Sequence, residues 1–385
     1  MSERLRIAVI AGDGIGPEIV PPACRVVEAA AARHGASLDF TDYDWGSDHY
    51  RRTGRMMPID GLQRLRGHDA IFFGAVGDPE IPDVETLWGL LIPMRRGFEQ
   101  YVNLRPARST PGVPTPLADR DPIDLVIVRE NVEGEYSEVG GLEHEGSADE
   151  AATQVARFSR RGTARVARYA AELARTRTGR LVSATKSNGI IHSMPFWDRV
   201  VAETVAEVPG VTLRSVLVDA LSAEVVSRPG QLDVIVASNL FGDILSDLAA
   251  ACVGSLGLAA SANLNPERAY PSLFEPVHGS APDIAGLGIA NPLAQIRSGA
   301  MMLAHLGLPE AAAEIDAAVD AVLADGPRSR DLGGSASTEE VAAAVLNAVG
   351  RGPSSRLGTG QTVDPAATRR PSSATGASSG RSSSA

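Results

Sequence analysis

Leu232-Asp-Val-Ile-Val-Ala237 leads directly into Ser238-Asn-Leu-Phe-Gly-Asp-Ile-Leu-Ser-Asp247, and this stretch decides the fold class. Its first part is a short apolar run with β-branched residues, which predicts a buried strand, and its second part starts a helix. Five similar apolar runs, separated by helix-like segments, lie at 6–11, 69–74, 125–128, 181–184 and 213–218. This alternation predicts an α/β protein with an open, largely parallel sheet.

Polar or Gly-rich residues follow these predicted strands. They are Gly74-Ala-Val-Gly77, Arg129-Glu-Asn131, Thr185-Lys-Ser-Asn188, Asp219-Ala220 and Ser238-Asn239. Parallel sheets bind ligands at the carboxyl ends of their strands. We therefore expect these five segments to gather at one edge of the sheet and to form the functional site there.

The first apolar run ends at Gly12-Asp-Gly-Ile-Gly16, followed by Pro17-Glu18 and an Ala-rich helix to about Arg33. A strand, a Gly turn and a helix are the elements of a dinucleotide-binding Rossmann unit. However, the third glycine lies two residues after the second rather than three, so the GxGxxG pattern is not met. A standard Rossmann fold is therefore not predicted.

Composition limits the functional classes. The chain has 385 residues, enough for two domains or one large α/β unit, and its net charge of -11 argues against binding to nucleic acid or anionic membranes. Cys24 and Cys252 have no CxxC partner, which predicts no disulfide framework, no zinc site and a reducing, cytoplasmic setting. No apolar run approaches the length of a membrane helix, and the N-terminal run is too short for a signal peptide.

Several further segments carry structural expectations. Residues 154–174 read as an amphipathic helix with an arginine stripe at Arg157, Arg161, Arg165 and Arg168. The stripe is either a solvated face with local ion pairs or a phosphate or partner site. Residues 134–151 suggest an exposed arm or loop, and late helices are expected at 294–306, 309–325 and 338–349. Residues 351–385 are dominated by Ser, Gly, Thr, Ala and Pro, which predicts a disordered tail.

Lys186 is the only lysine among 36 basic residues. Arginine does not release its proton in a protein, whereas a lysine ammonium can when its surroundings lower its pKa. A site that must release and recover a proton is thus a natural place for the one lysine that arginine has not replaced. The alternative is chance in an arginine-biased sequence.

Asp243 and Asp247 lie one helical turn apart, and Asp219 follows an earlier predicted strand. Two carboxylates on one helix face repel each other unless a cation lies between them, and oxygen ligands suit Mg²⁺ or Mn²⁺. The alternative is that both aspartates simply favour the start of a helix. With Asp219, the pair forms a plausible divalent-metal site.

Two other groups of residues suggest ligands. Arg95, Arg105 and Arg129 could grip carboxylates and, together with a metal and a lysine, suggest a dicarboxylic acid. The polar Gly/Pro-rich segment 275–292 contains His278 and Asp283, and an ordered loop of this length is usually functional. A carboxylate at Asp283 could bind a ribose diol and would repel a 2′-phosphate, which favours NAD over NADP.

Together these motifs resemble those of the isocitrate/isopropylmalate dehydrogenase family, the decarboxylating β-hydroxyacid dehydrogenases. The resemblance covers about residues 5–348 and rests on Gly12-Asp-Gly-Ile-Gly-Pro-Glu18, Asn103-Leu-Arg-Pro106, Arg129-Glu-Asn131 with Tyr136, Asn239–Asp247 and Glu275–Gly286. Within the family, the chain looks most like the branch acting on tartrate and D-malate. Supporting segments are Leu87-Trp-Gly89, Phe98–Asn103, Glu133–Tyr136, Ser183–Gly189 and Ser261–Glu267.

The resemblance implies roles for individual residues. Tyr136 would be the acid near the decarboxylating carbon, and Lys186 of a partner subunit would take the substrate hydroxyl proton. The substrate would contact Arg95, Arg105, Arg129, Trp88 and Asn188. Mn²⁺ or Mg²⁺ would bind Asp243 and Asp247 of one subunit and Asp219 of the other. NAD would bind His278, Gly279, Ser280, Ala281, Asp283, Ile284 and Asn291.

The family resemblance also implies a two-domain open α/β fold that works as a homodimer. The expected domains are a cofactor domain of 1–100 plus 254–350 and a substrate, metal and dimerisation domain of 101–253. The bulky apolar segment Leu87–Pro93 makes isocitrate an unlikely substrate and suits malate or tartrate. Three alternatives stay open: 3-isopropylmalate as substrate, a non-catalytic regulatory subunit, and a Mg²⁺-dependent phosphatase built on the Asp pair.

Overall fold

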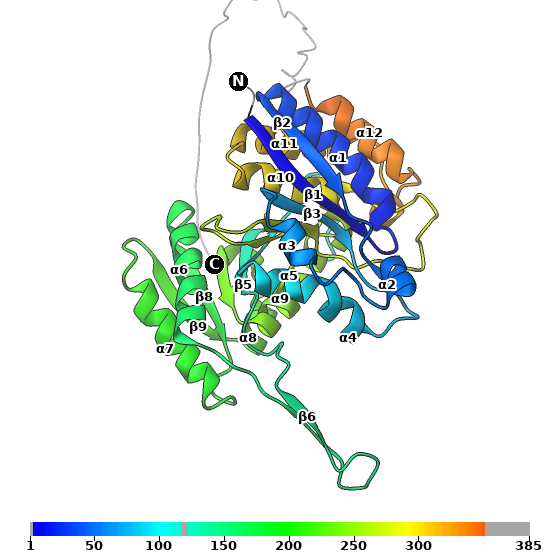
Figure 1. Cartoon of the computed structure of the whole chain (residues 1–385). Coiled ribbons are helices and arrows are strands. Elements are labelled where there is room, and N and C mark those ends of the chain that lie inside the picture. Colours follow the sequence, from blue (N-terminus) through cyan, green and yellow to red (C-terminus); the bar gives the residue numbers. More distant parts are fainter. Residues whose placement is uncertain (1–2, 118–121, 351–385) are drawn as a thin grey trace, which may run out of the picture. The chain divides into compact units, whose positions relative to one another are not determined.

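A ten-stranded sheet runs through the described residues, 3–117 and 122–350, of this computed structural model (Figure 1). Its strand order is β2-β1-β3-β12-β11-β4-β5-β10-β8-β9. The strands are β1 (Glu3–Gly12), β2 (Ala36–Asp42), β3 (Ala70–Ala75), β4 (Val102–Arg108), β5 (Asp124–Glu130), β8 (Arg180–Thr185), β9 (Thr212–Leu217), β10 (Val234–Ala237), β11 (Ala260–Leu264) and β12 (Ser272–Pro276). The α/β class and the largely parallel sheet are confirmed.

The direction of the sheet reverses in its middle. Strand β11 pairs antiparallel with both β12 and β4, and β4 pairs antiparallel with β5, whereas the other neighbours are parallel. The carboxyl ends of β5, β10, β8 and β9 therefore lie at one edge, and those of β1, β3 and β12 lie at the opposite edge. The expectation that all five polar segments gather at one edge is wrong for Gly74–Gly77, because apolar runs do not reveal strand direction.

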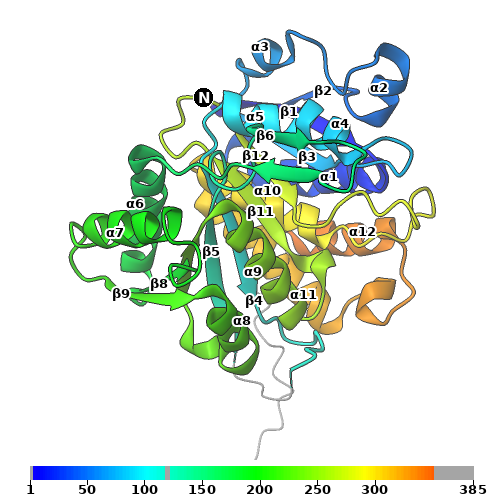
Figure 2. The same cartoon turned by 90° about the horizontal axis from the view of Figure 1, so that it is seen from below.

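Helices cover both faces of the sheet (Figures 1 and 2). Helix α1 packs on α10, α11 and α12, while α6 packs on α7 and α8 on α9. The longer helices are α1 (Gly16–Arg33), α6 (Arg160–Thr176), α7 (Ser193–Val205), α8 (Val218–Ser227), α9 (Asn239–Cys252), α10 (Leu293–His305), α11 (Pro309–Asp325) and α12 (Thr338–Ala348). Shorter ones are α2 (Ser47–Thr53), α3 (Gly61–Leu65), α4 (Asp83–Thr86) and α5 (Ile92–Gly97), with a π-helical turn at Leu87–Leu91.

The apolar runs in the strands are explained by burial on two sides. In β1, Ile7 and Val9 belong to one core cluster, whereas Ala8 and Ile10 belong to a second. All four side chains are at most 4% exposed. A strand covered on both faces loses the polar alternation of a half-exposed strand, which is why such runs predict it.

The predicted helix at 154–174 begins later than expected. Gln154 ends the short strand β7 (Ala151–Gln154), and α6 starts at Arg160, where the Ser159 side chain caps its first turn. Two members of the arginine stripe form ion pairs, Arg161 with Glu99 and Arg168 with Glu207, whereas the guanidinium of Arg165 lies 4.2 Å from the centre of the Tyr101 ring. These pairs agree with a solvated face.

The exposed arm predicted at 134–151 is confirmed from residue 138 onward and extends to residue 157, whereas Gly134 is buried and residues 135–137 are partly buried. Strands β6 (Gly140–Glu143) and β7 form a separate two-stranded antiparallel sheet that projects from the neighbouring elements (Figure 1). Every residue of both strands is exposed. Strand β9, expected to be buried, is instead a partly exposed edge strand. The late helices agree with their predicted ranges within two residues, and the capping box of Ser337 and Glu340 is present.

The remaining expectations concern the cysteines, membrane helices, the domain division and the C-terminal tail. Cys24 and Cys252 are both free, as expected. Among the described residues, no helix combines the length and apolar character needed to cross a membrane. The division into domains 1–100 plus 254–350 and 101–253 stays a prediction, and the described part of both segments shares the one large sheet. The predicted disordered tail, 351–385, lies outside the described residues.

Candidate active site

Asp243 lies at the centre of a cluster of predicted site residues. Its Oδ1 accepts hydrogen bonds from Arg105 Nη1, at 3.0 Å, and from Arg129 Nη1. Its Oδ2 accepts a 2.7 Å hydrogen bond from the hydroxyl of Tyr136. Arg105 also approaches Asp247 Oδ1, at 3.5 Å. The fold thus brings two candidate carboxylate-binding arginines, the candidate acid and both candidate metal ligands of α9 together.

The close approach of α9 to β5 creates this cluster. The hydroxyl of Ser238 caps α9 by accepting the amide of Phe241. Gly242 faces β5, and a Cβ there would lie 2.6 Å from the Cβ of Arg129. Only glycine allows this separation, so Gly242 sets the distance between Asp243 and Arg129. Asn239 Oδ1 then accepts hydrogen bonds from Arg129 Nε and Nη2, which fixes the orientation of the guanidinium.

The charges of the cluster shift its pKa values. Burial disfavours the charged form of Asp243, but the charges of Arg129 and Arg105 and the bond from Tyr136 outweigh it, so the pKa of Asp243 is lowered. Burial raises the pKa of Asp247. Burial and the hydrogen bond to Asp243 raise the pKa of Tyr136, so its hydroxyl keeps its proton and can act as a donor.

Arg95 joins this cluster to the start of the predicted cofactor loop. Arg95 Nη2 donates a 2.9 Å hydrogen bond to Glu275 Oε1, which also accepts from Asn263 Nδ2 at 2.8 Å. The positive charge of Arg95 acts to lower the pKa values of Asp243 and Tyr136, and the negative charge of Glu275 acts to raise the pKa of His278. Arg95 Nε and Arg105 Nε are buried without a hydrogen-bond partner, so both arginines keep a free donor.

A hollow of about 720 Å³ opens beside this cluster. Trp88, Leu87 and Ile92 provide apolar walls, and Arg95 and Tyr136 provide polar ones. The guanidinium carbon of Arg96 lies 4.8 Å from the centre of the Trp88 ring, and Arg96 Nη2 donates to the carbonyl of Tyr136 at 2.9 Å. The predicted substrate residues Trp88 and Arg95 thus line one cavity with the candidate acid.

Lys186, Asn188 and Asp219 do not join this cluster within one chain. Lys186 Nζ donates a 2.7 Å hydrogen bond to Asp219 Oδ1, and both residues lie at the carboxyl edge of β8 and β9. Among the described residues, no hydrogen bond or ion pair links Lys186 or Asp219 to Asp243, Asp247 or Arg129. Nor does the described part of a single chain contain a group of three or more His, Cys, Asp or Glu residues placed to hold a metal ion.

The predicted cofactor residues form a loop that follows β12. His278 Nε2 is buried without a partner, and burial lowers the pKa of His278, so the imidazole is neutral and offers a free polar atom. Ser280 is buried, Gly279 and Asp283 are exposed, and Ile284 packs against the core. Asn291 Nδ2 donates to Asp331 Oδ2 at 3.0 Å, which anchors the far end of the loop. Ala281 has a φ of 42°, a strained value for a residue other than glycine.

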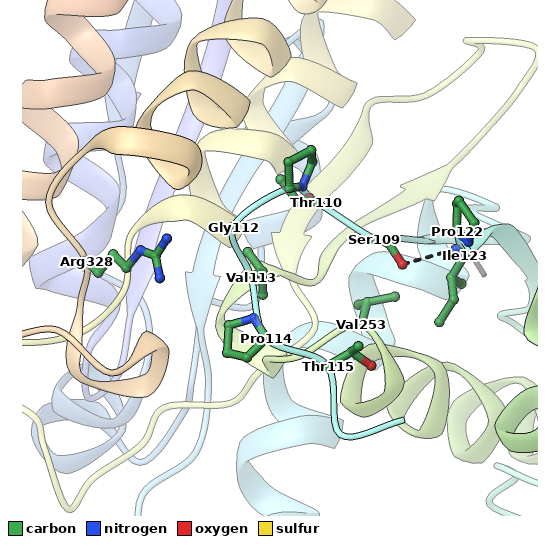
Figure 3. A pocket seen from close by; sticks show the side chains of 11 residues that line it. Ser109, Thr110, Gly112, Val113, Pro114, Thr115, Pro122, Ile123, Val253 and Arg328 are labelled. Carbon is green, nitrogen blue, oxygen red and sulfur yellow. Dashed lines mark hydrogen bonds between the residues drawn. The ribbon is translucent and has the colours of Figure 1, made fainter. Parts of the chain in front are cut away.

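A second hollow, of about 670 Å³, lies at the connection between β4 and β5 (Figure 3). Its lining includes Ser109, Thr110, Val113, Val253 and Arg328. None of the predicted site residues lines it. It lies at the amino end of β5, whereas Arg129 is near the carboxyl end, so it is separate from the candidate active site.

Sequence reasoning missed several residues that shape the site. Glu275 and Asn239 belong to the motifs that carry the family resemblance, but no role is predicted for either. The same holds for Ser246, whose Oγ accepts a 2.6 Å hydrogen bond from Arg105 Nη1. Glu135 holds the Tyr136 loop on α9 by accepting from the Ser238 hydroxyl and the Leu240 amide. What these residues share in the sequence is a polar side chain close in the chain to a predicted reactive residue. Such a pattern indicates the region of the site but not which side chains hydrogen-bond to one another.

The isocitrate/isopropylmalate dehydrogenase family model matches residues 6–345. The chain belongs to this family. It is 51% identical over 359 residues to D-malate dehydrogenase (decarboxylating) of Escherichia coli, covering 91% of this chain and 99% of that one. It is also 51% identical over 361 residues to tartrate dehydrogenase/decarboxylase of Pseudomonas putida, with the same coverage.

Solved structures of the family share the fold. Isocitrate dehydrogenase from Methylococcus capsulatus superposes with a TM-score of 0.82 and 37% identity, over 90% of this chain and 99% of that one. A β-decarboxylating dehydrogenase from Thermococcus kodakarensis superposes with a TM-score of 0.73 and 38% identity, over 90% of this chain and 96% of that one. This chain thus shares the α/β fold of these family members, built on a mixed, largely parallel ten-stranded sheet.

Proposed function

We propose that this protein catalyses the NAD- and divalent-metal-dependent oxidative decarboxylation of D-malate or tartrate. The observation that carries the proposal is the arrangement around Asp243. Two arginines suited to a dicarboxylate and a protonated tyrosine all lie within hydrogen-bonding distance of this candidate metal carboxylate. The names of the E. coli and P. putida relatives, at 51% identity each, support the choice of substrates.

The residues fit both implied cofactors. Asp243 and Asp247, with Asp219 of a partner subunit, offer the hard oxygen donors that Mg²⁺ and Mn²⁺ prefer. The buried, unpartnered Nε2 of His278 and the loop that follows it offer polar groups to NAD. When bound, the metal would polarise the substrate C2 oxygen and NAD would accept the C2 hydrogen with its electron pair.

The protein's own residues have three tasks in this reaction. Arg95, Arg105 and Arg129 hold the two substrate carboxylates, and Arg95 and Arg105 each keep an Nε donor without a hydrogen-bond partner. Lys186 of the partner subunit, with Asn188 nearby, takes the proton of the C2 hydroxyl. Tyr136 donates its proton to the carbon that loses CO₂, a role that its raised pKa supports.

The proposal includes a homodimer whose sites are shared between subunits. Apolar side chains are exposed beside the proposed site residues: Ile191, near Lys186, is 69% exposed, and Ile244, between the two α9 aspartates, is 53% exposed. The β6–β7 arm also exposes Val139 and Leu142. Because an isolated two-stranded hairpin is only marginally stable in water, packing against a second subunit would stabilise this arm. A second copy that covers these residues could bring its Lys186 and Asp219 to Asp243. We also place the enzyme in the cytoplasm, which suits its two free cysteines.

The alternatives are weaker on specific grounds. 3-Isopropylmalate would need to place its isopropyl group in the cavity beside the bulky Trp88 ring. A regulatory subunit should lack a proton-transfer residue or a metal ligand, whereas Tyr136, Lys186 and the three aspartates are present. A phosphatase would leave the loop at His278 and the arginines without a role.

The test is a substrate panel with purified protein, NAD and Mn²⁺. D-malate, tartrate, 3-isopropylmalate and isocitrate are compared by kcat/KM for NADH formation, with CO₂ release measured in parallel. We expect D-malate or tartrate to give the highest kcat/KM and equal amounts of NADH and CO₂ from D-malate. Absence of NADH with all four acids would refute the proposal, and a preference for 3-isopropylmalate would support the runner-up.

A further inference from the structure

We propose that the turn Gly12–Glu18 positions the cofactor loop, with Glu18 as the positioning residue for NAD. The inference rests on the proposed function, because it takes the segment after His278 as the NAD-binding loop. The turn lies outside that segment and lacks the GxGxxG pattern. Its hydrogen bonds go to the cofactor loop, so we assign the turn a positioning role rather than direct binding of the cofactor's phosphates.

The turn holds the cofactor loop at two separated points. The amide of Ile15 donates to the carbonyl of Ser280 at 2.9 Å. The Glu18 carboxylate accepts the amide of Gly286 at Oε1 and the amide of Gly288 at Oε2, the latter at 2.8 Å. These bonds enclose residues 281–285, which include the proposed NAD contacts Ala281, Asp283 and Ile284.

Glu18 uses both oxygens on the loop. A glutamate in the first turn of a helix ordinarily interacts with the amides of its own helix, whereas Glu18 of α1 bonds amides 268 and 270 residues away. Hydrogen bonds to a carboxylate are stronger than neutral ones. A glutamine at this position would keep one acceptor and turn an NH₂ group toward the other amide.

The turn itself is rigid enough to act as a fixed support. The buried carboxylate of Asp13 accepts the amide and hydroxyl of Ser47 and the amide of Gly77, at 2.6, 2.8 and 2.9 Å. Gly14 has a φ of 55°, and a Cβ there would lie 2.0 Å from the carbonyl oxygen of Ser280. The backbone of the turn and that of the loop are therefore in direct contact, and a side chain cannot fit between them.

The loop needs this support because its conformation is costly. Ala281 is held at a φ of 42°, and a backbone in that region is retained only when its surroundings enforce it. Gly286, Leu287 and Asp283 are exposed, so packing contributes little on that side. On the other side, α12 holds the end of the loop through bonds from Thr338 to the carbonyls of Gly288 and Ala290. Without Glu18, NAD binding would have to order the loop, which lowers the apparent affinity.

The experiment compares Glu18→Gln with Glu28→Gln in the full chain. Glu28 is an exposed glutamate on the same helix and serves as the matched control. NADH affinity is measured by fluorescence titration, and KM for NAD, KM for D-malate and kcat by NADH formation. Amide hydrogen exchange of residues 280–288 and the melting temperature are measured on the same samples.

For Glu18→Gln, we expect the NADH dissociation constant and KM for NAD to rise about tenfold, the effect of losing one charge-assisted hydrogen bond. We expect faster exchange in residues 280–288, with kcat and KM for D-malate within about twofold of the native values. Unchanged NADH affinity in a folded Glu18→Gln protein would overturn the inference, as would an equal effect of Glu28→Gln. If Glu18→Gln does not fold, Glu18→Asp, which keeps the charge on a shorter side chain, is tested by the same criteria. A native protein that binds NADH but oxidises no hydroxy acid would refute the proposed function while leaving this inference standing.

Discussion

Lys186 Nζ donates a 2.7 Å hydrogen bond to Asp219 Oδ1 across two adjacent strand ends, β8 and the β9–α8 junction. The hydrogen bond from Lys186 and backbone amides at the start of α8 lower the pKa of Asp219. The side chain of Asp219 is 64% exposed to solvent, and that of Lys186 is 32% exposed. A charged pair of this kind, open to solvent and separate from the Asp243 cluster, is suited to completing a site in a second subunit.

The first prediction concerns the lysine itself. Lys186→Arg keeps the positive charge but removes the ability to accept a proton at neutral pH. We expect kcat to fall by about two to four orders of magnitude, the range for loss of a general base, with NADH affinity unchanged. The control is Arg180→Lys, at the exposed start of the same strand. Native kcat in Lys186→Arg would mean that the lysine supplies charge alone.

The second prediction tests whether the site is shared. Lys186→Arg and Asp243→Asn proteins are each expected to be nearly inactive. If Lys186 acts in the partner's site, a mixed dimer contains one site with both native residues. Random reassembly of equal amounts should therefore recover about one quarter of native activity, because half of the dimers are mixed and each has one intact site of two. No recovery after verified subunit exchange would place both residues in the same subunit's site.

The third prediction concerns the divalent metal. Mn²⁺ added to metal-free protein at about 100 times its dissociation constant should stabilise the native state by about 2.7 kcal/mol and raise the melting temperature. Asp247→Asn should lose most of this increase, because a candidate charged ligand is gone while the contacts of Asp243 with Arg129 and Tyr136 remain. Asp149→Asn, on the exposed arm, is the control. An equal Mn²⁺ effect in all three proteins would exclude Asp247 as a ligand.

The fold was largely predictable, because burial leaves a direct record in sequence. Runs such as Leu125–Val128 are apolar on both faces of a strand, and Ser337 with Glu340 marks a helix start through local bonds. Strand direction was not predictable, since β4 and β11 reverse the sheet through pairings between distant residues. The start of α6 was misplaced because the apolar spacing continues through Val155 and Phe158, outside the helix that Ser159 caps.

The candidate site was predictable as a set of residues but not as a geometry. Asp243 and Asp247 follow from one helical turn, and Arg129 from a strand end. The roles of Gly242 and Glu275 depend on distances between β5 and α9 and between α5 and β12, which no local pattern encodes. A single chain also leaves Lys186 and Asp219 apart from Asp243, so the complete site depends on an assembly that a sequence alone describes only by resemblance.

The fourth prediction concerns Glu130, a buried carboxylate beside Arg129. Its Oε2 accepts the amides of Val132 and Glu133, at 3.0 and 2.7 Å, while its buried Oε1 has no partner. Burial raises the pKa of Glu130 from 4.5 to about 7. The native state therefore keeps this proton in a pH range where the unfolded chain has lost it. Because the unfolded chain loses this proton at a lower pH than the native state, the stability of the native state falls progressively as the pH rises from about 4.5 to about 7.

Glu130→Gln should remove this pH dependence. The glutamine oxygen can accept both amides, and its NH₂ group takes the position that has no partner. Relative to the native protein, the variant should be similar in stability near pH 5 and more stable, by up to a few kcal/mol, near pH 8. Melting temperatures across this range measure the difference, with Glu143→Gln on the exposed arm as the control. A stability difference that is the same at every pH would show that the pKa of Glu130 is the same in the native and unfolded states, and would contradict this prediction.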